Sequence, residues 1–292
     1  MIPIVLASIV VATAAGVLNR RRVIRTIESE YASRFPSDAD GVADGAEGFA
    51  LKGTTGRGLL LLHGSGDSPQ SLRYLAGRLH AAGYGVHVPL LPGHGRTPYA
   101  FAVATANDYH AAVRGALAEV SASHAWVGVI GLSMGGALAA RLVAESSGVR
   151  VLVLLAPYMI PPRDVRLVRG VSWLWSPFAP YLRGRGEASV HDSVARNASR
   201  AYGSFSAGAL EALITTARAG RRALPKLALP MLVIHSTQDN RIPRALAEEA
   251  MGAITAPVER HWLEGCGHVI TVDYCKDTVV ELVLAFLARH AG

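Results

Sequence analysis

The chain has 292 residues, half of them hydrophobic, and a formal net charge of +7. This length and apolar content allow a large buried core and exclude a mainly disordered chain. The charge comes mostly from arginine, part of it at residues 20–22 and part at 163–185. Since the sequence contains no nucleic-acid-binding motif, we expect no nucleic-acid partner.

The N-terminal segment, residues 2–18, is apolar apart from two hydroxyl residues, and the arginines at 20–22 follow it. As a helix it would reach about 25 Å, near the lower limit for a membrane span. No basic residue precedes it, so the positive-inside rule predicts an uncleaved anchor over residues 1–22, with the rest of the chain on the cytoplasmic side. Two alternatives stay open: a signal peptide cleaved from a secreted protein, and a helix packed on a soluble cytoplasmic domain.

The next segment, residues 23–52, is polar and rich in small residues, and we expect a linker with a weak first strand. Beyond it, short apolar runs alternate with helical patterns. The predicted strands are 59–62, 86–91, 126–130, 151–155, 231–235 and 258–263. Strands that are apolar on both faces and separated by helices indicate an α/β fold with a mostly parallel central sheet and helices on both faces.

Residues 158–223 interrupt this alternation, because they contain no strand-like apolar run and several prolines. A connection of this length is too long for an ordinary loop between a strand and a helix. We therefore predict an inserted helical cap, which divides the core into a first part, 53–157, and a second part, 224–292.

A nucleophilic serine is predicted at Ser133, within the pattern G-x-S-x-G formed by residues 131–135. The pattern alone is weak, but here it follows the predicted strand 126–130 and precedes a helical run. A nucleophile elbow needs this strand-turn-helix context, because the turn strains the serine backbone and the glycines allow close approach. The alternative is a serine that caps an ordinary helix.

A serine hydroxyl needs a base to accept its proton, and the base needs an acid to orient it. His268 follows the last predicted strand, and Asp239 follows the strand at 231–235. The order Ser133, Asp239, His268 is the order in which this kind of fold supplies its triad. The alternatives are a surface histidine at 268 and a helix-capping carboxylate at 239.

An oxyanion formed during acyl transfer needs preorganised N–H donors. The backbone N–H of Met134, next to the nucleophile, is one predicted donor. The second is the backbone N–H of Ser65, in the glycine-rich loop 63–66 that follows a predicted strand. A glycine-rich turn with no role beyond its geometry is the alternative for this loop.

The two cysteines, Cys266 and Cys275, lie in no metal-binding or CxxC pattern, and we expect them to be reduced. A disulfide between them would fix the loop of His268, and this alternative stays open. We expect no metal and no cofactor.

The segments around 62–64, 91–95, 131–136, 235–243 and 265–273 make the chain similar to small bacterial carboxylesterases and monoacylglycerol lipases of the α/β-hydrolase superfamily. The resemblance extends over about residues 59–289 and is loose in the cap. It implies a serine esterase that cleaves short or medium acyl esters or monoacylglycerols without a cofactor, with the same triad and oxyanion donors.

The cap is rich in arginine and in aromatic residues, among them Trp173, Trp175 and Phe178. These three are the candidates for substrate binding, either as a lid over an acyl pocket or against anionic lipid. Packing of the cap onto the core would explain them equally well. A membrane-tethered binding module without turnover, and a thioesterase, peptidase or acyltransferase with the same triad, are the alternative functions. The oligomeric state is not predicted.

Overall fold

The computed structural model describes residues 2–184 and 188–290, with side chains described from residue 14 onward. Its centre is a seven-stranded sheet in the order β1-β3-β2-β4-β5-β8-β9. The strands are β1 (Phe49–Leu51), β2 (Arg57–Leu62), β3 (Gly85–Val88), β4 (Trp126–Leu132), β5 (Val149–Leu155), β8 (Met231–Ser236) and β9 (Val258–Leu263). Only β1 runs antiparallel to its neighbour, so the predicted mostly parallel sheet is confirmed.

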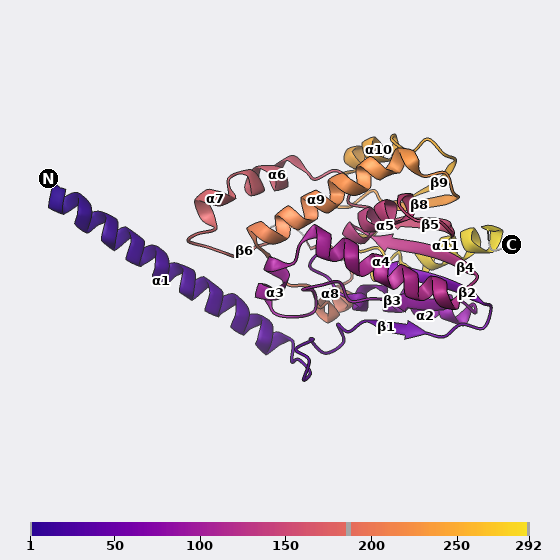
Figure 1. Cartoon of the computed structure of the whole chain (residues 1–292), viewed down its shortest axis with the longest axis horizontal. Coiled ribbons are helices and arrows are strands. Elements are labelled where there is room, and N and C mark those ends of the chain that lie inside the picture. The colour runs from indigo at the N-terminus through magenta and orange to yellow at the C-terminus, as the bar shows by residue number, and fades with distance from the viewer. Residues whose placement is uncertain (1, 185–187, 291–292) are drawn as a thin grey trace.

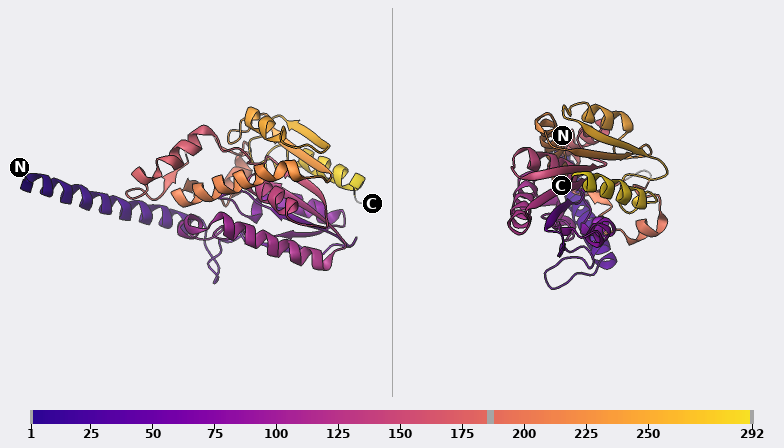
Figure 2. Two further views of the ribbon diagram at one scale, coloured as in Figure 1. Left: turned by 45° about the horizontal axis from the view of Figure 1, so that its top comes forward. Right: turned by 90° about the vertical axis from the view of Figure 1, so that its right-hand side faces the viewer.

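Helices cover both faces of this sheet (Figures 1 and 2). One face carries α4 (Ala106–Ser123), α5 (Met134–Ala144), α9 (Ala207–Ala223) and α10 (Arg244–Met251), and the other carries α2 (Arg73–Ala81) and α11 (Lys276–His290). Shorter helices are η1 (Pro69–Leu72), α3 (Pro98–Val103) and η2 (Leu224–Lys226). The central strands β2 and β4 are buried along almost their whole length. This explains their unbroken apolar sequences, because both faces of each strand are covered.

The segment between β5 and β8 contains α6 (Arg163–Gly170), α7 (Ser172–Trp175), β6 (Leu182–Arg183), α8 (Ser193–Ala198) and β7 (Ser204–Phe205). No strand was predicted in this segment, but β6 and β7 pair with each other in a short antiparallel ladder. Two-residue strands are too short to leave a recognisable periodicity in the sequence.

The helix α9 was expected to belong to the cap, and the structure places it against α5 on the core. A Cβ atom on Gly220 would lie 2.6 Å from the carbonyl oxygen of Ala137, so the two helices are in close backbone contact. The buried residues of α9 include Ala212 and Ala217, which belong to the same apolar cluster as α5. The last part of the predicted insertion therefore packs as a helix of the core layer.

The first helix, α1 (Ile2–Arg34), projects away from the rest of the molecule (Figures 1 and 2). Residues 23–34, expected in a linker, continue this helix, and Ile27 and Tyr31 are buried. The side chains of residues 2–13, most of the predicted anchor, lie outside the described part. Among the residues that were described, none of the helices is long and apolar enough to span a bilayer.

Candidate active site

The loop between β4 and α5 holds Ser133 in a strained turn, with φ 55° and ψ −118°. Such a positive φ is uncommon for a residue with a side chain, and it persists only where the surroundings enforce it. The flanking glycines permit the turn. A Cβ on Gly131 would lie 2.3 Å from the carbonyl oxygen of Gly135, and a Cβ on Gly135 would lie 2.1 Å from that of Leu62. The G-x-S-x-G pattern is therefore required by close backbone packing.

The structure brings the imidazole of His268 to the serine. Its Nε2 lies 2.8 Å from Ser133 Oγ, and its Nδ1 lies 2.7 Å from Asp239 Oδ2. This spacing fits a neutral imidazole that accepts the serine O–H at Nε2 and donates its Nδ1–H to the carboxylate. All three residues are buried, so water competes little for these hydrogen bonds.

The carboxylate of Asp239 is held by the turn that follows it. Its Oδ1 accepts hydrogen bonds from the backbone N–H groups of Arg241 and Ile242, at 2.7 and 2.8 Å. Burial opposes ionisation of this group, but the nearby imidazole of His268 and these hydrogen bonds outweigh it and hold the pKa of Asp239 below its usual value. The carboxylate therefore stabilises the turn before α10, but it does not cap that helix, whose N-cap residue is Pro243 without a side-chain hydrogen bond.

The two predicted oxyanion donors come from different loops: Ser65 follows β2, and Met134 directly follows Ser133 at the start of α5. A Cβ on Gly64 would lie 3.3 Å from Ser133 Cβ, so the loop after β2 contacts the nucleophile directly. In the described part of the chain, neither the N–H of Ser65 nor that of Met134 has a hydrogen-bond partner in the protein. Two N–H groups without a protein partner beside a nucleophile are suited to bind a developing negative charge.

A buried histidine shapes the loop 63–66, which carries the predicted donor Ser65. His63 Nε2 accepts the backbone N–H of Leu91 at 3.1 Å, and its Nδ1 lies 2.9 Å from the carbonyl oxygen of Gly64. Burial keeps the pKa of His63 well below its usual value. The neutral ring therefore donates Nδ1–H to Gly64 and fixes the carbonyl that precedes the Ser65 N–H.

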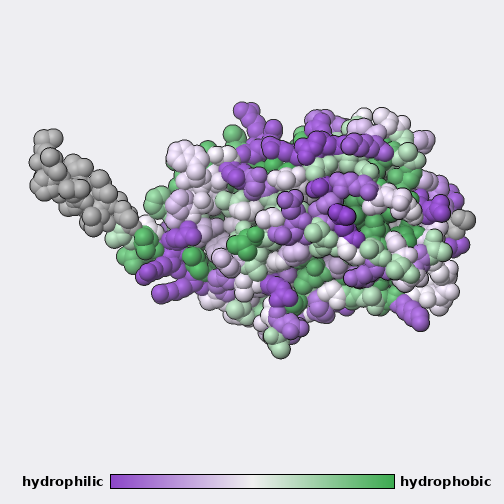
Figure 3. Space-filling model, viewed as in Figure 1, coloured by the Kyte–Doolittle hydropathy of each residue, from purple (hydrophilic) through white to green (hydrophobic). Residues whose placement is uncertain are grey.

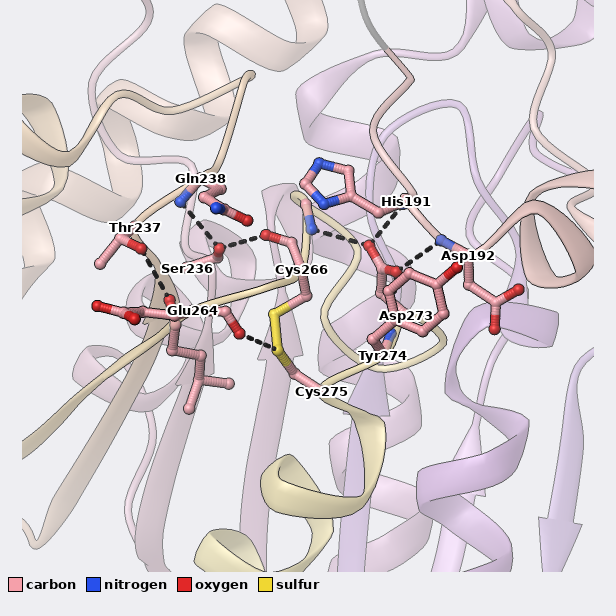
Figure 4. The surroundings of a disulfide bond; sticks show 12 residues. His191, Asp192, Ser236, Thr237, Gln238, Glu264, Cys266, Asp273, Tyr274 and Cys275 are labelled. Atoms are coloured by element: carbon pink, nitrogen blue, oxygen red, sulfur yellow. Dashed lines mark hydrogen bonds between the residues drawn. A yellow bond between two sulfur atoms is a disulfide. The ribbon is translucent and has the colours of Figure 1, made fainter.

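The two cysteines are joined in a disulfide, Cys266–Cys275, with the Cα atoms 5.8 Å apart (Figure 4). The expectation of reduced thiols was wrong, because the loop containing His268 folds back and brings the two ends of a nine-residue interval together. Ser236 joins the same loop to the Asp239 turn, since its hydroxyl donates to the carbonyl oxygen of Cys266 and accepts the N–H of Gln238. The acid and the base are thus held by loops that are connected to each other.

Three acidic or basic residues near the site were missed by the sequence analysis. His235 Nε2 lies 3.3 Å from Asp239 Oδ2, Asp67 follows the loop 63–66, and Asp273 binds the backbone next to His268. Burial raises the pKa of Asp67 to about 6. A single sequence gives no signal for Asp67 or Asp273, whereas His235 could have been found from its position four residues before Asp239.

The cap aromatics differ from the expected pocket wall. Trp173 is 71% exposed. Phe178 is 51% exposed, and its ring lies against α1, since a Cβ on Gly16 would be 2.7 Å from its Cδ1. Trp175 is partly buried, and its indole N–H donates to the carbonyl oxygen of Val168 within the cap. In the described residues, no hydrogen bond or ring contact joins these side chains to Ser133 or His268. Their role in substrate binding stays a prediction.

A parallel sheet with a strained serine elbow after β4, an acid after β8 and a histidine after β9 defines the α/β-hydrolase fold. In the part of the chain that the structure describes, no group of three or more His, Cys, Asp or Glu side chains could hold a metal ion. The family model described as "Serine aminopeptidase, S33" matches residues 55–274, and the chain belongs to this family.

Two characterised relatives of the chain are also hydrolases, a monoacylglycerol lipase and a carboxylesterase. The thermostable monoacylglycerol lipase of Bacillus sp. (strain H-257) is 30% identical over 254 residues, which cover 86% of this chain and 98% of that protein. The carboxylesterase of Bacillus subtilis (strain 168) is 24% identical over 243 residues, which cover 82% of this chain and 96% of the relative. The chain is an α/β-hydrolase related to esterases and lipases.

Solved structures show the same fold. One from a study of two metagenome-derived lipolytic enzymes has a TM-score of 0.78 at 30% identity and covers 85% of this chain and 100% of its own. The monoacylglycerol lipase of Paleococcus ferrophilus has a TM-score of 0.69 at 16% identity, covering 82% of this chain and 99% of that one.

Proposed function

We propose that the protein is a serine hydrolase that cleaves carboxylic esters, either short or medium acyl esters or monoacylglycerols, through an acyl-enzyme on Ser133. The observation that supports this most strongly is the relay from Ser133 Oγ to His268 Nε2, 2.8 Å, and from His268 Nδ1 to Asp239 Oδ2, 2.7 Å. The names of the Bacillus relatives, a monoacylglycerol lipase and a carboxylesterase, favour ester substrates.

In the proposed mechanism, His268 Nε2 takes the proton of the Ser133 hydroxyl while Oγ attacks the ester carbonyl carbon. The carbonyl oxygen becomes an oxyanion, which accepts hydrogen bonds from the N–H groups of Ser65 and Met134. The imidazolium, stabilised by Asp239, then gives its proton to the alcohol that leaves. In the second half, His268 takes a proton from water, and the resulting hydroxide attacks the acyl carbon. The bond to Ser133 Oγ then breaks, His268 returns the proton to Oγ, and the carboxylic acid leaves.

The test is a comparison of the wild-type enzyme with Ser133→Ala on p-nitrophenyl esters from C2 to C16 and on monoacylglycerols. We expect a loss of at least about 10³-fold in kcat/KM, since the nucleophile is removed. Ser123→Ala, at the end of α4, is the matched control and should retain activity. A Ser133→Ala enzyme that keeps most of its activity would contradict the mechanism.

Assays on the same purified proteins distinguish the alternative functions from ester hydrolysis. A fluorophosphonate probe should label Ser133 in the wild-type protein, and absence of labelling would favour a binding module without turnover. A thioesterase, peptidase or acyltransferase would turn over acyl thioesters, amino-acid p-nitroanilides or an added acceptor alcohol faster than the esters of the panel.

We further propose that the chain associates with anionic membranes through residues 2–18 and the adjoining face of the cap. The cap and α1 are in contact, since the Asn19 side chain donates to the carbonyl oxygen of Phe178 at 3.1 Å. Leu18 and Phe178 lie exposed at this junction, and Figure 3 shows hydrophobic and hydrophilic residues side by side there. Arg20 donates to the carbonyl oxygens of Ser176 and Pro177 and fixes this junction, while Arg21 and Arg22 bind lipid phosphates next to the apolar surface.

This association is tested by sedimentation with vesicles of phosphatidylcholine alone or with phosphatidylglycerol. The full chain should sediment with the anionic vesicles, and a variant beginning at residue 23 should stay in the supernatant with its ester hydrolysis unchanged. Full-length protein that remains wholly in the supernatant would contradict the proposal.

The disulfide indicates in which compartment the catalytic domain lies. Disulfides persist mainly in oxidising compartments, and Cys266 is fully buried in the bonded form. We therefore propose that the catalytic domain lies outside the cytoplasm, opposite to the orientation that the arginines at 20–22 predict. Alkylation of the protein in intact cells tests this, because free thiols at both positions would restore the cytoplasmic orientation.

A further inference from the structure

The loop that carries His268 is bound to the middle of the inserted cap. The segment 188–192, which precedes α8, lies against this loop and against the Asp239 turn. The N–H of Val269 donates to the carbonyl oxygen of Ser189 at 3.2 Å, and the Asn240 side chain donates to that of Ala188 at 3.0 Å. A short stretch of the cap therefore contacts both loops that supply the acid and the base.

One buried carboxylate joins these segments (Figure 4). Asp273 Oδ2 accepts the backbone N–H groups of Gly267 and His191, each at 2.8 Å. Its Oδ1 accepts those of Asp192 and Tyr274, at 2.8 and 2.9 Å. Asp273 is 0% exposed, so all four hydrogen bonds form away from water, and the carboxylate links three stretches of chain.

The charge of this group is explained by its partners. Burial opposes ionisation of Asp273, but the four backbone N–H donors outweigh it and hold its pKa below the usual value. A neutral amide could not replace it, because an amide has one acceptor oxygen and would point an NH₂ group at N–H donors.

The loop around Gly267 and His268 is packed so closely on the cap segment that it cannot adjust independently of it. A Cβ on Gly267 would lie 2.6 Å from the carbonyl oxygen of Ser189, so the residue before His268 is in contact with the cap segment. A shift of residues 188–192 would therefore displace the backbone that supports the His268 imidazole.

We infer that Asp273 is a positioning residue whose carboxylate holds the His268 loop on the cap segment 188–192. The distance from His268 to Ser133 then depends on the position of this segment. The inference rests on the proposed function, since it assigns His268 the role of base. Asp273 itself does not contact Ser133, and we assign it no part in the chemistry.

The test uses Asp273→Asn in the full-length protein, with kcat and KM measured separately on a p-nitrophenyl ester. Loss of alignment should lower kcat about 10- to 100-fold and leave KM within about threefold, because alignment acts on the chemical step. The rate of fluorophosphonate labelling of Ser133 should fall by a similar factor. A wild-type kcat and labelling rate in a folded Asp273→Asn protein would overturn the inference.

A second pair of variants keeps the test valid if Asp273→Asn fails to fold. Asp192 caps α8 with its side chain and donates its backbone N–H to Asp273, and its φ of −61° suits proline. Asp192→Ala loses only the cap, whereas Asp192→Pro loses the cap and the N–H. We expect Asp192→Pro to be about tenfold slower in kcat than Asp192→Ala, and equal rates would overturn the inference.

Failure of the proposed ester hydrolysis and failure of the positioning role of Asp273 give different results. If the wild-type protein hydrolyses no ester of the panel, the proposed substrate class is wrong, and the labelling rate of Ser133 still reports on the role of Asp273. If esters are hydrolysed and the labelling rate is the same in all four proteins, only the positioning role is wrong.

Discussion

The Nε2 of His235 lies 3.3 Å from Oδ2 of Asp239, the oxygen that also binds His268. The same Nε2 donates its N–H to the carbonyl oxygen of Ile242 at 3.1 Å, so the ring holds the turn that follows Asp239 and lies beside its carboxylate without a hydrogen bond to it. Burial lowers the pKa of His235, and the ring acts as a neutral donor.

We therefore expect His235→Phe to lower kcat about tenfold with little change in KM, because the carbonyl oxygen of Ile242 loses its donor. A buried carbonyl left without a donor costs about 1–3 kcal/mol, and here it loosens the turn that holds Asp239. His235→Asn keeps an N–H donor and should recover part of the loss. Steady-state kinetics of the two variants checks this, and equal kcat values for His235→Phe and the wild-type enzyme would contradict it.

In the loop 63–66, we expect a change that moves the backbone to reduce activity more than a change that removes only a side chain. Gly64→Ala places a methyl group 3.3 Å from Ser133 Cβ, so the loop must shift and move the Ser65 N–H. We expect at least a tenfold loss of kcat, since misplaced donors stabilise the transition state less. Ser65→Ala keeps the N–H and should stay within about threefold of the wild-type enzyme. If Ser65→Ala were the more damaging change, the side chain of Ser65 would have to take part.

The raised pKa of Asp67 predicts that the protein loses stability as the pH rises between about 4 and 6. Its folded-state pKa is about 6 and its ordinary value is 3.8. In this window the folded state keeps a proton that the unfolded state has lost, so stability falls as the pH rises through 6. Asp67→Asn removes this penalty.

We expect Asp67→Asn to raise the free energy of unfolding at pH 8, relative to its effect at pH 4, by at most about 3 kcal/mol. Urea denaturation at both pH values measures it. Asp40→Asn, at an exposed acid, is the control. A gain for Asp67→Asn that is the same at pH 4 and pH 8 would disagree with the raised pKa.

The disulfide predicts a joint effect on stability and rate. Replacing Cys266 and Cys275 with serine frees a short loop and should lower the free energy of unfolding by about 2–3 kcal/mol by the loop-entropy estimate. Because His268 lies inside this loop, kcat should fall as well. Wild-type enzyme treated with reductant should match the double variant in both measurements. Unchanged kcat would mean that Asp273 and Ser236 fix the loop without the bond.

The sheet and the serine elbow could be predicted because their causes are local. Residues 126–130 are apolar on both faces, as a covered parallel strand must be, and the glycines at 131 and 135 are demanded by backbone contacts. The positions of Asp239 and His268 followed from the strands that precede them. Their meeting with Ser133 depended on the order of strands in the sheet, which the fold type supplies.

The remaining features depend on contacts between distant segments. The sequence of α9 shows which of its faces is apolar, but not that Gly220 would pack against Ala137. The pairing of Cys266 with Cys275 depends on how the intervening loop turns. Asp273 has no local signal, because its partners at 191 and 192 lie about 80 residues earlier in the chain.

The end of the long first helix also covers a cluster of aromatic side chains on the catalytic domain. Its final turns bury Tyr31, which stacks on Tyr202 of the segment after α8, and Tyr202 stacks in turn on Phe101. Shortening the protein for crystallisation should therefore stop before Ile27. Cutting at the end of the helix would uncover these rings, and we expect such a fragment to aggregate during expression.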